Sequence, residues 1–258
     1  MLTLGVDDAG RGPLIGPMIL SGVLLTNEQE RKLKKFGIKD SKELTHKERV
    51  RLSKEIKVNS LNCETVSAFP KEIDEAVLGN QVNLNTLEAR KMAEVINALN
   101  SGKYLKEKIK VYVDCPSTNI STWQNKLVNF IKHIGNLEIV CEHKADANYV
   151  SVGAASILAK VTREEEVAKI RKEFGEIGSG YPADPITKKF LVENGRKLRD
   201  SGIFRKSWST WKKMFPGRGQ ATLEDFNNFY PRLNTKPMVI DQRGYGVPYG
   251  AGHYASFH

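Results

Sequence analysis

The chain has 258 residues, of which 40% are hydrophobic and 27% charged, with a net charge of +10 at pH 7. This length suits one sizeable α/β domain with an appendage, or two small domains. The positive charge favours a polyanionic partner, nucleic acid first and an anionic membrane second. No apolar run approaches the roughly 20 residues that span a membrane, and there is no N-terminal signal pattern. The three cysteines are far apart and indicate reduced thiols. We therefore expect a cytoplasmic monomer with no membrane association.

The N-terminal segment combines two apolar runs with an unusual polar turn. Residues 2–6 and 18–25 predict two buried strands, and Asp7-Asp8 and Gly10-Arg11-Gly12 lie between them. Burying an acidic side chain at the end of a strand costs free energy unless a metal ion or an arginine balances its charge. Glycine also lets the backbone around Arg11 come close to a ligand. Together these residues indicate metal-assisted chemistry on a phosphate; an ordinary polar hairpin is the alternative.

Further along, strands alternate with helices. Hydrophobic periodicity and capping signals predict strands over 61–69, 109–113 and 137–141, and helices over 27–36, 45–57, 83–99, 118–133, 149–174, 186–199 and 207–215. Thr45 and Glu48 fit a capping box. Beyond Pro216 helical periodicity is lost, and residues 244–252 are typical of a flexible tail.

Two more acids stand where a ligand would bind an α/β sheet. Asp114 ends the strand over 109–113, and Asp146 follows the strand over 137–141. Asp146 also begins a helix, where the dipole favours an acid for structural reasons alone. Lys42 precedes the helix over 45–57 and could reach a phosphate, although a surface lysine is the commoner explanation. Tyr181 is presented by a Gly- and Pro-rich loop over 178–185.

Several motifs occur together in the order of a known family. They are Gly-Val-Asp-Asp-Ala-Gly-Arg-Gly-Pro at 5–13, Asp-Ser-Lys at 40–42, Val-Asp at 113–114, Lys-Ala-Asp at 144–146, Ala-Ala-Ser-Ile-Leu-Ala-Lys-Val-Thr-Arg at 154–163 and Gly-Ser-Gly-Tyr at 178–181. Over roughly residues 1–215 the chain resembles type 2 ribonuclease H, ribonuclease HII, in its archaeal form. The resemblance implies an α/β ribonuclease H-like fold, a five-stranded mixed sheet flanked by helices, with a C-terminal helical region. We expect a catalytic domain over 1–180, a basic helical region over 181–218 and an extension with a flexible tail over 219–258.

The resemblance also implies roles for single residues. Asp7, Asp8, Asp114 and Asp146 would be the catalytic acids and the ligands of Mg²⁺ or Mn²⁺. The loop Gly10-Arg11-Gly12 would read the ribonucleotide at an RNA–DNA junction, and Tyr181 would stack near its sugar. Lys42, Lys160 and Arg163 would contact phosphates. The family has Glu where this chain has Asp8, which shortens the reach of that carboxylate by one methylene.

The expected activity is hydrolysis of a phosphodiester by two divalent ions, which clustered carboxylates suit because hard cations prefer oxygen ligands. We predict an endonuclease that cuts the RNA strand of RNA–DNA hybrids and cuts 5′ of ribonucleotides embedded in duplex DNA. The products would carry 3′-hydroxyl and 5′-phosphate ends. Residues 196–218 hold eight Lys/Arg against one acid and would bind the duplex backbone. The alternatives are a hybrid-binding protein whose catalysis is weakened by Asp8, and a ribonuclease H-like nuclease that acts on DNA alone.

One segment lies outside the catalytic motifs. Residues 220–226 resemble the box by which proteins bind sliding clamps, with Gln220, Leu223 and Phe226 in its pattern and Asn227 in place of its last aromatic residue. One helical turn would place Leu223 and Phe226 in an apolar groove. A helical turn that packs on its own domain is the alternative.

Overall fold

The computed structural model describes residues 1–38, 44–79, 82–216, 238–240 and 246–248. It divides into two compact units, Met1–Trp208 and Ser209–His258. Lys42 and the clamp-box residues Gln220, Leu223 and Phe226 lie outside the described residues. The division of the chain at residues 180 and 218 stays a prediction. Among the described helices, none has the length and apolar character needed to cross a membrane.

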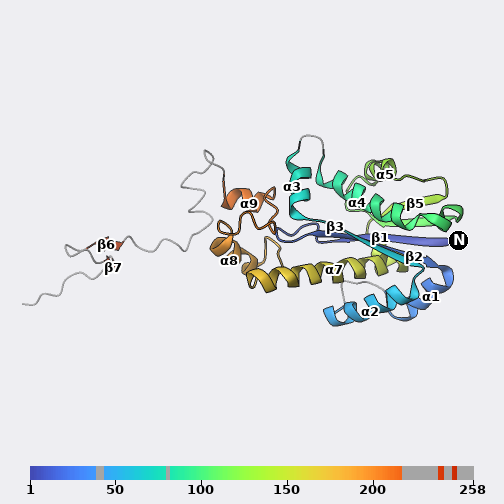
Figure 1. Ribbon diagram of the computed structural model, residues 1–258, viewed down its shortest axis with the longest axis horizontal. Coiled ribbons are helices and arrows are strands. Elements are labelled where there is room, and N and C mark those ends of the chain that lie inside the picture. The colour runs from blue at the N-terminus through green and yellow to red at the C-terminus, as the bar shows by residue number, and fades with distance from the viewer. Residues whose placement is uncertain (39–43, 80–81, 217–237, 241–245, 249–258) are drawn as a thin grey trace, which may run out of the picture. The chain divides into compact units, whose positions relative to one another are not determined.

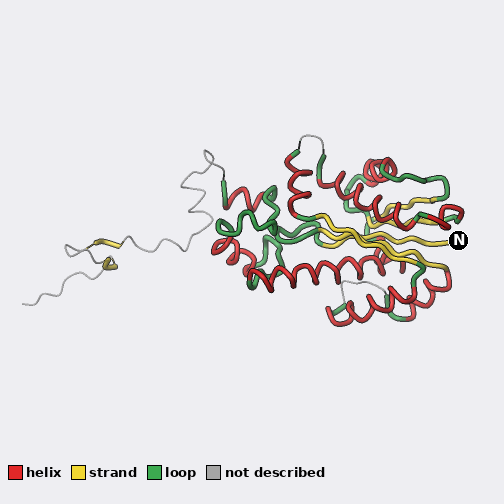
Figure 2. Tube along the Cα trace, viewed as in Figure 1, coloured by secondary structure: helices red, strands yellow, loops and turns green. Residues whose placement is uncertain are grey.

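A five-stranded sheet forms the centre of the first unit (Figures 1 and 2). The strand order is β3-β2-β1-β4-β5. The pairs β1–β2 and β2–β3 are antiparallel, while β1–β4 and β4–β5 are parallel. The strands are β1 (Leu2–Ala9), β2 (Met18–Thr26), β3 (Asn62–Ala68), β4 (Ile109–Asp114) and β5 (Leu137–Glu142). The mixed five-stranded sheet expected from the sequence is confirmed.

Helices cover both faces of this sheet. Figure 1 shows α3, α4 and α5 on one face and α1, α2 and α7 on the other. The helices are α1 (Asn27–Lys35), α2 (His46–Asn59), α3 (Pro70–Leu78), α4 (Leu84–Leu99), α5 (Ile120–Asn129), α6 (Ala145–Asn148), α7 (Val150–Phe174) and α8 (Pro185–Asn194), with the 3-10 helix η1 (Gly102–Lys106). The capping box at the start of α2 is present, since Thr45 N–H donates to Glu48 at 2.9 Å.

Some boundaries differ from the sequence-based expectation. Strand β1 runs on through Asp7 and Asp8, because these residues pair with Ser21 and Leu20 of β2. Helix α8 ends at Asn194, earlier than expected, and Gly195 follows it. Helix α3 was not expected; Pro70 stands in its first turn, where a missing N–H is tolerated.

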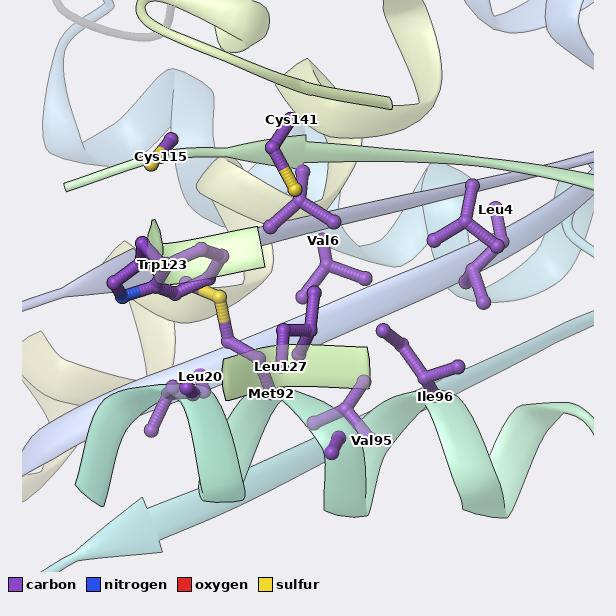
Figure 3. Close-up of a cluster of buried hydrophobic side chains, with 14 of the residues drawn as sticks. Leu4, Val6, Leu20, Met92, Val95, Ile96, Cys115, Trp123, Leu127 and Cys141 are labelled. Atoms are coloured by element: carbon purple, nitrogen blue, oxygen red, sulfur yellow. The ribbon is translucent and has the colours of Figure 1, made fainter. Parts of the chain in front are cut away.

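Each face of the sheet buries its own apolar cluster. The first cluster lies under α4 and α5, where Leu4 and Val6 of β1 meet Met92, Ile96 and other residues (Figure 3). The second lies under α1, α2 and α7 and includes Leu33, Ile56 and Ile157. Helix α7 lies so close to β1 that a Cβ on Gly5 would fall 2.1 Å from the Ser151 backbone. This close approach explains the run of small residues in the first half of α7.

The second unit contains α9 (Ser209–Met214) and an antiparallel pair of short strands, β6 (Met238–Ile240) and β7 (Gly246–Pro248). The helix expected over 207–215 is therefore present in a shorter form. The flexible tail expected over 244–252 stays a prediction; Gly246–Pro248 within it pairs with the apolar run Met238–Ile240.

Candidate active site

The adjacent acids of β1 point in opposite directions because successive side chains of a strand alternate between the two faces. Asp7 faces α7, where the Ser156 hydroxyl donates to its carboxylate, and its exposed fraction is only 4%. Asp8 lies on the α4 face, within hydrogen-bonding reach of Glu88. The Asp8 backbone N–H also donates to Asp7 Oδ1 at 2.7 Å. The pair that looks uniform in the sequence thus meets two different surroundings.

The other two predicted acids come from the carboxyl ends of β4 and β5. Val6 of β1 pairs with Val113 of β4, so Asp7 and Asp114 follow side by side at the same edge of the sheet. Asp114 Oδ1 accepts the N–H of Ala145 at 2.9 Å, which holds the turn that carries Asp146. Asp146 begins α6 and is 4% exposed. The turn depends on Lys144, whose left-handed backbone has a φ of 59°.

A further acid, Glu88 of α4, lies in the same region and was not predicted. Its side chain is fully buried, and its Oε2 lies 3.0 Å from the Arg11 Nε. Asn85 on the same helix accepts from Arg11 Nη2 at 2.6 Å. The sequence contains a signal for Glu88, because it stands four residues after Leu84 and four before Met92, on the apolar face of α4.

The acids raise one another's pKa. Burial raises the pKa of Asp7 well above its ordinary value, and the charges of Asp8 and Asp114 add to the rise. Burial also raises the pKa of Asp8, with Glu88 and Asp114 contributing and Arg11 opposing. The pKa of Glu88 is raised by burial to about 7, although Arg11 lowers it. Such a cluster of like charges favours a bound cation.

The donor set fits a hard divalent cation. The clustered groups offer carboxylate oxygens, which Mg²⁺ and Mn²⁺ prefer. In the part of the chain that the structure describes, no three acid, histidine or cysteine side chains form a ready metal-binding group. Mg²⁺ keeps several of its own waters and needs only one or two carboxylates together with substrate phosphates. The assignment of Asp7, Asp8, Asp114 and Asp146 as metal ligands stays a prediction.

Next to the acids is a cavity of about 290 Å³. Most of the residues predicted to bind substrate line it: Gly10, Arg11, Gly12, Lys160, Arg163 and Tyr181, together with Asp8, Ala9 and Glu164. The Arg163 guanidinium lies 5.6 Å from the centre of the Tyr181 ring. Tyr181 is 44% exposed, and its ring lies 3.3 Å from the position a Cβ would take on Gly12. Backbone, aromatic ring and cations therefore surround one opening.

The basic region is divided between surface and interior. Arg196, Lys197 and Arg199 are exposed and available to a polyanion. Arg205, in contrast, is fully buried, and its guanidinium donates to backbone carbonyls. The charge count of the sequence could not separate these two environments.

Comparison with known proteins shows the family to which this chain belongs. The family model described as Ribonuclease HII matches residues 4–211. Ribonuclease HII of Methanococcus maripaludis strain C6 is 41% identical over 223 residues, which cover 83% of this chain and 87% of the relative. The crystal structure of ribonuclease H2 from Pyrococcus horikoshii OT3 matches with a TM-score of 0.73 and 37% identity, covering 83% of this chain and 97% of that one.

A second solved structure is the complex of PCNA with ribonuclease HII from Archaeoglobus fulgidus. Its matching chain has a TM-score of 0.69 and 34% identity, covering 87% of this chain and 100% of that one. The resemblance to archaeal ribonuclease HII seen in the sequence is therefore confirmed, as is the ribonuclease H-like fold. The chain belongs to the ribonuclease HII family and is an enzyme of the ribonuclease H type.

Proposed function

We propose that this ribonuclease H cuts RNA–DNA hybrids and also cuts on the 5′ side of single ribonucleotides embedded in duplex DNA. The observation that carries the proposal is the cavity beside the acids, lined by Asp8, the 10–12 loop, Arg163 and Tyr181. At about 290 Å³ the cavity lies at the lower end of the size range of small-ligand pockets, which suits part of a single nucleotide. The family membership supports hydrolysis of RNA in hybrids.

Selection of RNA rests on the 2′-hydroxyl, which can both donate and accept a hydrogen bond. The N–H groups of Arg11 and Gly12 have no protein acceptor within the described part of the chain. They are suited to donate hydrogen bonds to oxygen atoms of a sugar or phosphate. The ring of Tyr181 lies against Gly12, where it can pack on the sugar of the same nucleotide. DNA would offer this loop no hydroxyl at that position.

Asp7, Asp8, Asp114 and Asp146 would hold divalent ions, Mg²⁺ or Mn²⁺. When bound, such ions lower the pKa of a water and neutralise charge on the phosphate. Ser156 and the Asp8 N–H fix the Asp7 carboxylate, and the Ala145 N–H fixes Asp114. Lys160 and Arg163 line the cavity and would hold the phosphates that flank the scissile bond. The product ends would be a 3′-hydroxyl and a 5′-phosphate.

The proposal is tested with a DNA duplex that carries one ribonucleotide, incubated with Mg²⁺ or Mn²⁺. We expect one cut, immediately 5′ of the ribonucleotide, and no cut in the matched all-DNA duplex. A full RNA–DNA hybrid in a parallel reaction reports the activity of the enzyme preparation. Cleavage of the hybrid without cleavage at the single ribonucleotide would contradict the proposal, and cleavage of the all-DNA duplex would favour a nuclease of broader specificity.

We also propose that the C-terminal extension binds a sliding clamp. The supporting facts are the clamp-like box at 220–226 and the related chain from Archaeoglobus fulgidus, whose structure is a complex with PCNA. Capture of the full chain on an immobilised archaeal clamp should be lost when Leu223 and Phe226 are both changed to Ala. Capture that survives the double change would contradict the assignment, and retained cleavage shows that the variant is folded.

A further inference from the structure

The loop Gly10-Arg11-Gly12 is held in place by a segment almost two hundred residues later in the chain. Residues 203–208, here called the brace, run beside residues 14–16. Ile15 and Phe204 form an antiparallel bridge. The Arg205 N–H donates to the Leu14 carbonyl, and the Gly16 N–H donates to the Ile203 carbonyl, each at 2.9 Å. The brace therefore pairs with residues 14–16, just after the loop, as a short added strand.

Two side chains of the brace donate hydrogen bonds to the backbone carbonyls of the loop. The Arg205 guanidinium donates to the carbonyl of Gly10 at 2.6 Å, of Arg11 at 2.8 Å and of Gly16 at 3.0 Å. The Trp208 Nε1 donates to the carbonyl of Gly12 at 3.0 Å. All three carbonyls of the 10–12 loop thus have donors from the brace. Because hydrogen bonds are directional, these donors favour one orientation of each peptide plane in the loop.

Arg205 and Trp208 also support each other. The guanidinium carbon lies 5.0 Å from the centre of the Trp208 ring, and the guanidinium is fully buried. Burial lowers the pKa of Arg205 to about 9, which leaves it charged at neutral pH. The Asp74 carboxylate of α3 accepts the N–H groups of Lys206 and Ser207, both at 2.8 Å. The brace is therefore anchored to the sheet's helical layer independently of the loop.

We propose that Arg205 and Trp208 are positioning residues that determine ribonucleotide specificity by holding the 10–12 loop in its reading conformation. The inference rests on the proposed function, because it gives the loop the task of reading the 2′-hydroxyl. The brace binds the loop's carbonyls, and the N–H groups of Arg11 and Gly12, which have no protein acceptor among the described residues, can donate to the substrate. Neither brace residue lines the cavity, so each acts through the loop.

The test uses Trp208→Phe, which keeps a ring beneath Arg205 but removes the donor to Gly12. One neutral hydrogen bond contributes about 0.5–1.5 kcal/mol, so kcat/KM on the single-ribonucleotide duplex should fall about 3–10-fold. Arg205→Lys keeps the charge but cannot reach three carbonyls, and should cost about 30-fold or more. On a duplex with four consecutive ribonucleotides, the mapped cuts should spread over more positions in both variants. Mn²⁺ affinity, measured by calorimetry, should not change.

Trp123→Phe is the matched control. Trp123 is 1% exposed in the first core cluster, and its Nε1 has no hydrogen-bond partner among the described residues. This control should lower the unfolding temperature through a small cavity while the cut positions stay as in the wild type. Trp208→Phe with wild-type kcat/KM and cut positions would overturn the inference, as would a spread of cuts in Trp123→Phe. A wild-type enzyme that cuts hybrids but not single ribonucleotides would instead overturn the proposed function.

Discussion

Arg11 and Glu88 form an ion pair in which the Nε and Oε2 atoms are 3.0 Å apart. The Glu88 side chain is fully buried, whereas the Arg11 side chain is 36% exposed, and Arg11 lines the cavity. The pair joins the 10–12 loop to α4. Arg205 and Trp208, which lie much later in the chain, donate to backbone carbonyls of the same loop. The loop is therefore fixed by both its side chain and its backbone.

Glu88 gives the metal-free protein a distinctive dependence on pH. Its pKa in the folded state is about 7, above the value of an unfolded chain. Between about pH 4.3 and 7 the folded state holds more protons than the unfolded state, so the free energy of unfolding falls as the pH rises. Glu88 alone contributes a fall of at most about 4 kcal/mol, and Asp7 and Asp8 act in the same direction.

Urea unfolding in EDTA at pH 5, 6, 7 and 8 measures this slope. Glu88→Gln should make it shallower, because one of the titrating groups is removed. Glu94→Gln is the control, since it makes the same change on a half-exposed residue of α4. Two results would show that the buried carboxyl is not coupled to folding. One is a free energy of unfolding of the wild type that rises from pH 5 to pH 7. The other is an unchanged dependence of this free energy on pH in Glu88→Gln.

Asp114→Asn should separate catalysis from folding. The amide oxygen of Asn can still accept the Ala145 N–H, so the turn that carries Asp146 should persist. The loss of one anionic oxygen donor should reduce cleavage at least about 100-fold, because a metal site is weakened. Cleavage rates and thermal unfolding are measured on Asp114→Asn and on Asp200→Asn, an exposed acid. Near wild-type cleavage by Asp114→Asn would remove this residue from the site.

Two glycines with the same backbone conformation should respond differently to Ala. Gly10 and Gly37 both have a φ of 83°. This left-handed backbone conformation costs about 1–2 kcal/mol of folding stability for a residue with a Cβ. A Cβ on Gly10 would fall 2.4 Å from the Arg163 side chain and 2.9 Å from the Pro17 carbonyl, whereas Gly37 has open space. Gly10→Ala should therefore lose more stability than Gly37→Ala in denaturant titrations, and only Gly10→Ala should lose cleavage. Equal behaviour of the two variants would refute the tight packing around the loop.

Asp8→Glu tests the one departure from the family motif. Glutamate extends the carboxylate by roughly 1.5 Å, while Mg²⁺ demands near-ideal octahedral geometry. We expect Asp8→Glu to raise the cleavage rate in Mg²⁺ more than in Mn²⁺, with Asp8→Asn inactive in both. A lower Mg²⁺ rate in Asp8→Glu would mean that the site has adapted to the shorter side chain, with Glu88 beside it.

The sequence predicted the sheet well because its strands are marked by strong apolar runs, such as residues 18–25, and by turn residues at their ends. The family motifs also pointed to seven of the nine residues that line the cavity, all but Ala9 and Glu164. Glu88 and Arg205 were missed for a physical reason. Each is a charged residue whose role depends on burial by segments distant in sequence, 77 and 195 residues away from their partners in the loop.

For the same reason, the sequence did not predict the hydrogen bond of Trp208 or the opposite directions of the Asp7 and Asp8 side chains. An indole donor reveals its acceptor only when the brace lies beside the loop. The direction of each acid side chain depends on the extent of β1, which continues through both residues to Ala9. Local patterns thus predict elements, whereas the partners of buried polar groups come from the tertiary structure.

If the cavity beside the acids recognises a single ribonucleotide, the enzyme should cut a DNA duplex at one embedded ribonucleotide. The cleavage products of this duplex are mapped in Mg²⁺ and in Mn²⁺, beside the same duplex without the ribonucleotide. We expect a single cut 5′ of the ribonucleotide, with 3′-hydroxyl and 5′-phosphate ends, and an intact all-DNA duplex. An uncut ribonucleotide duplex, from a preparation that cleaves a full RNA–DNA hybrid, would show that the cavity does not recognise a single ribonucleotide.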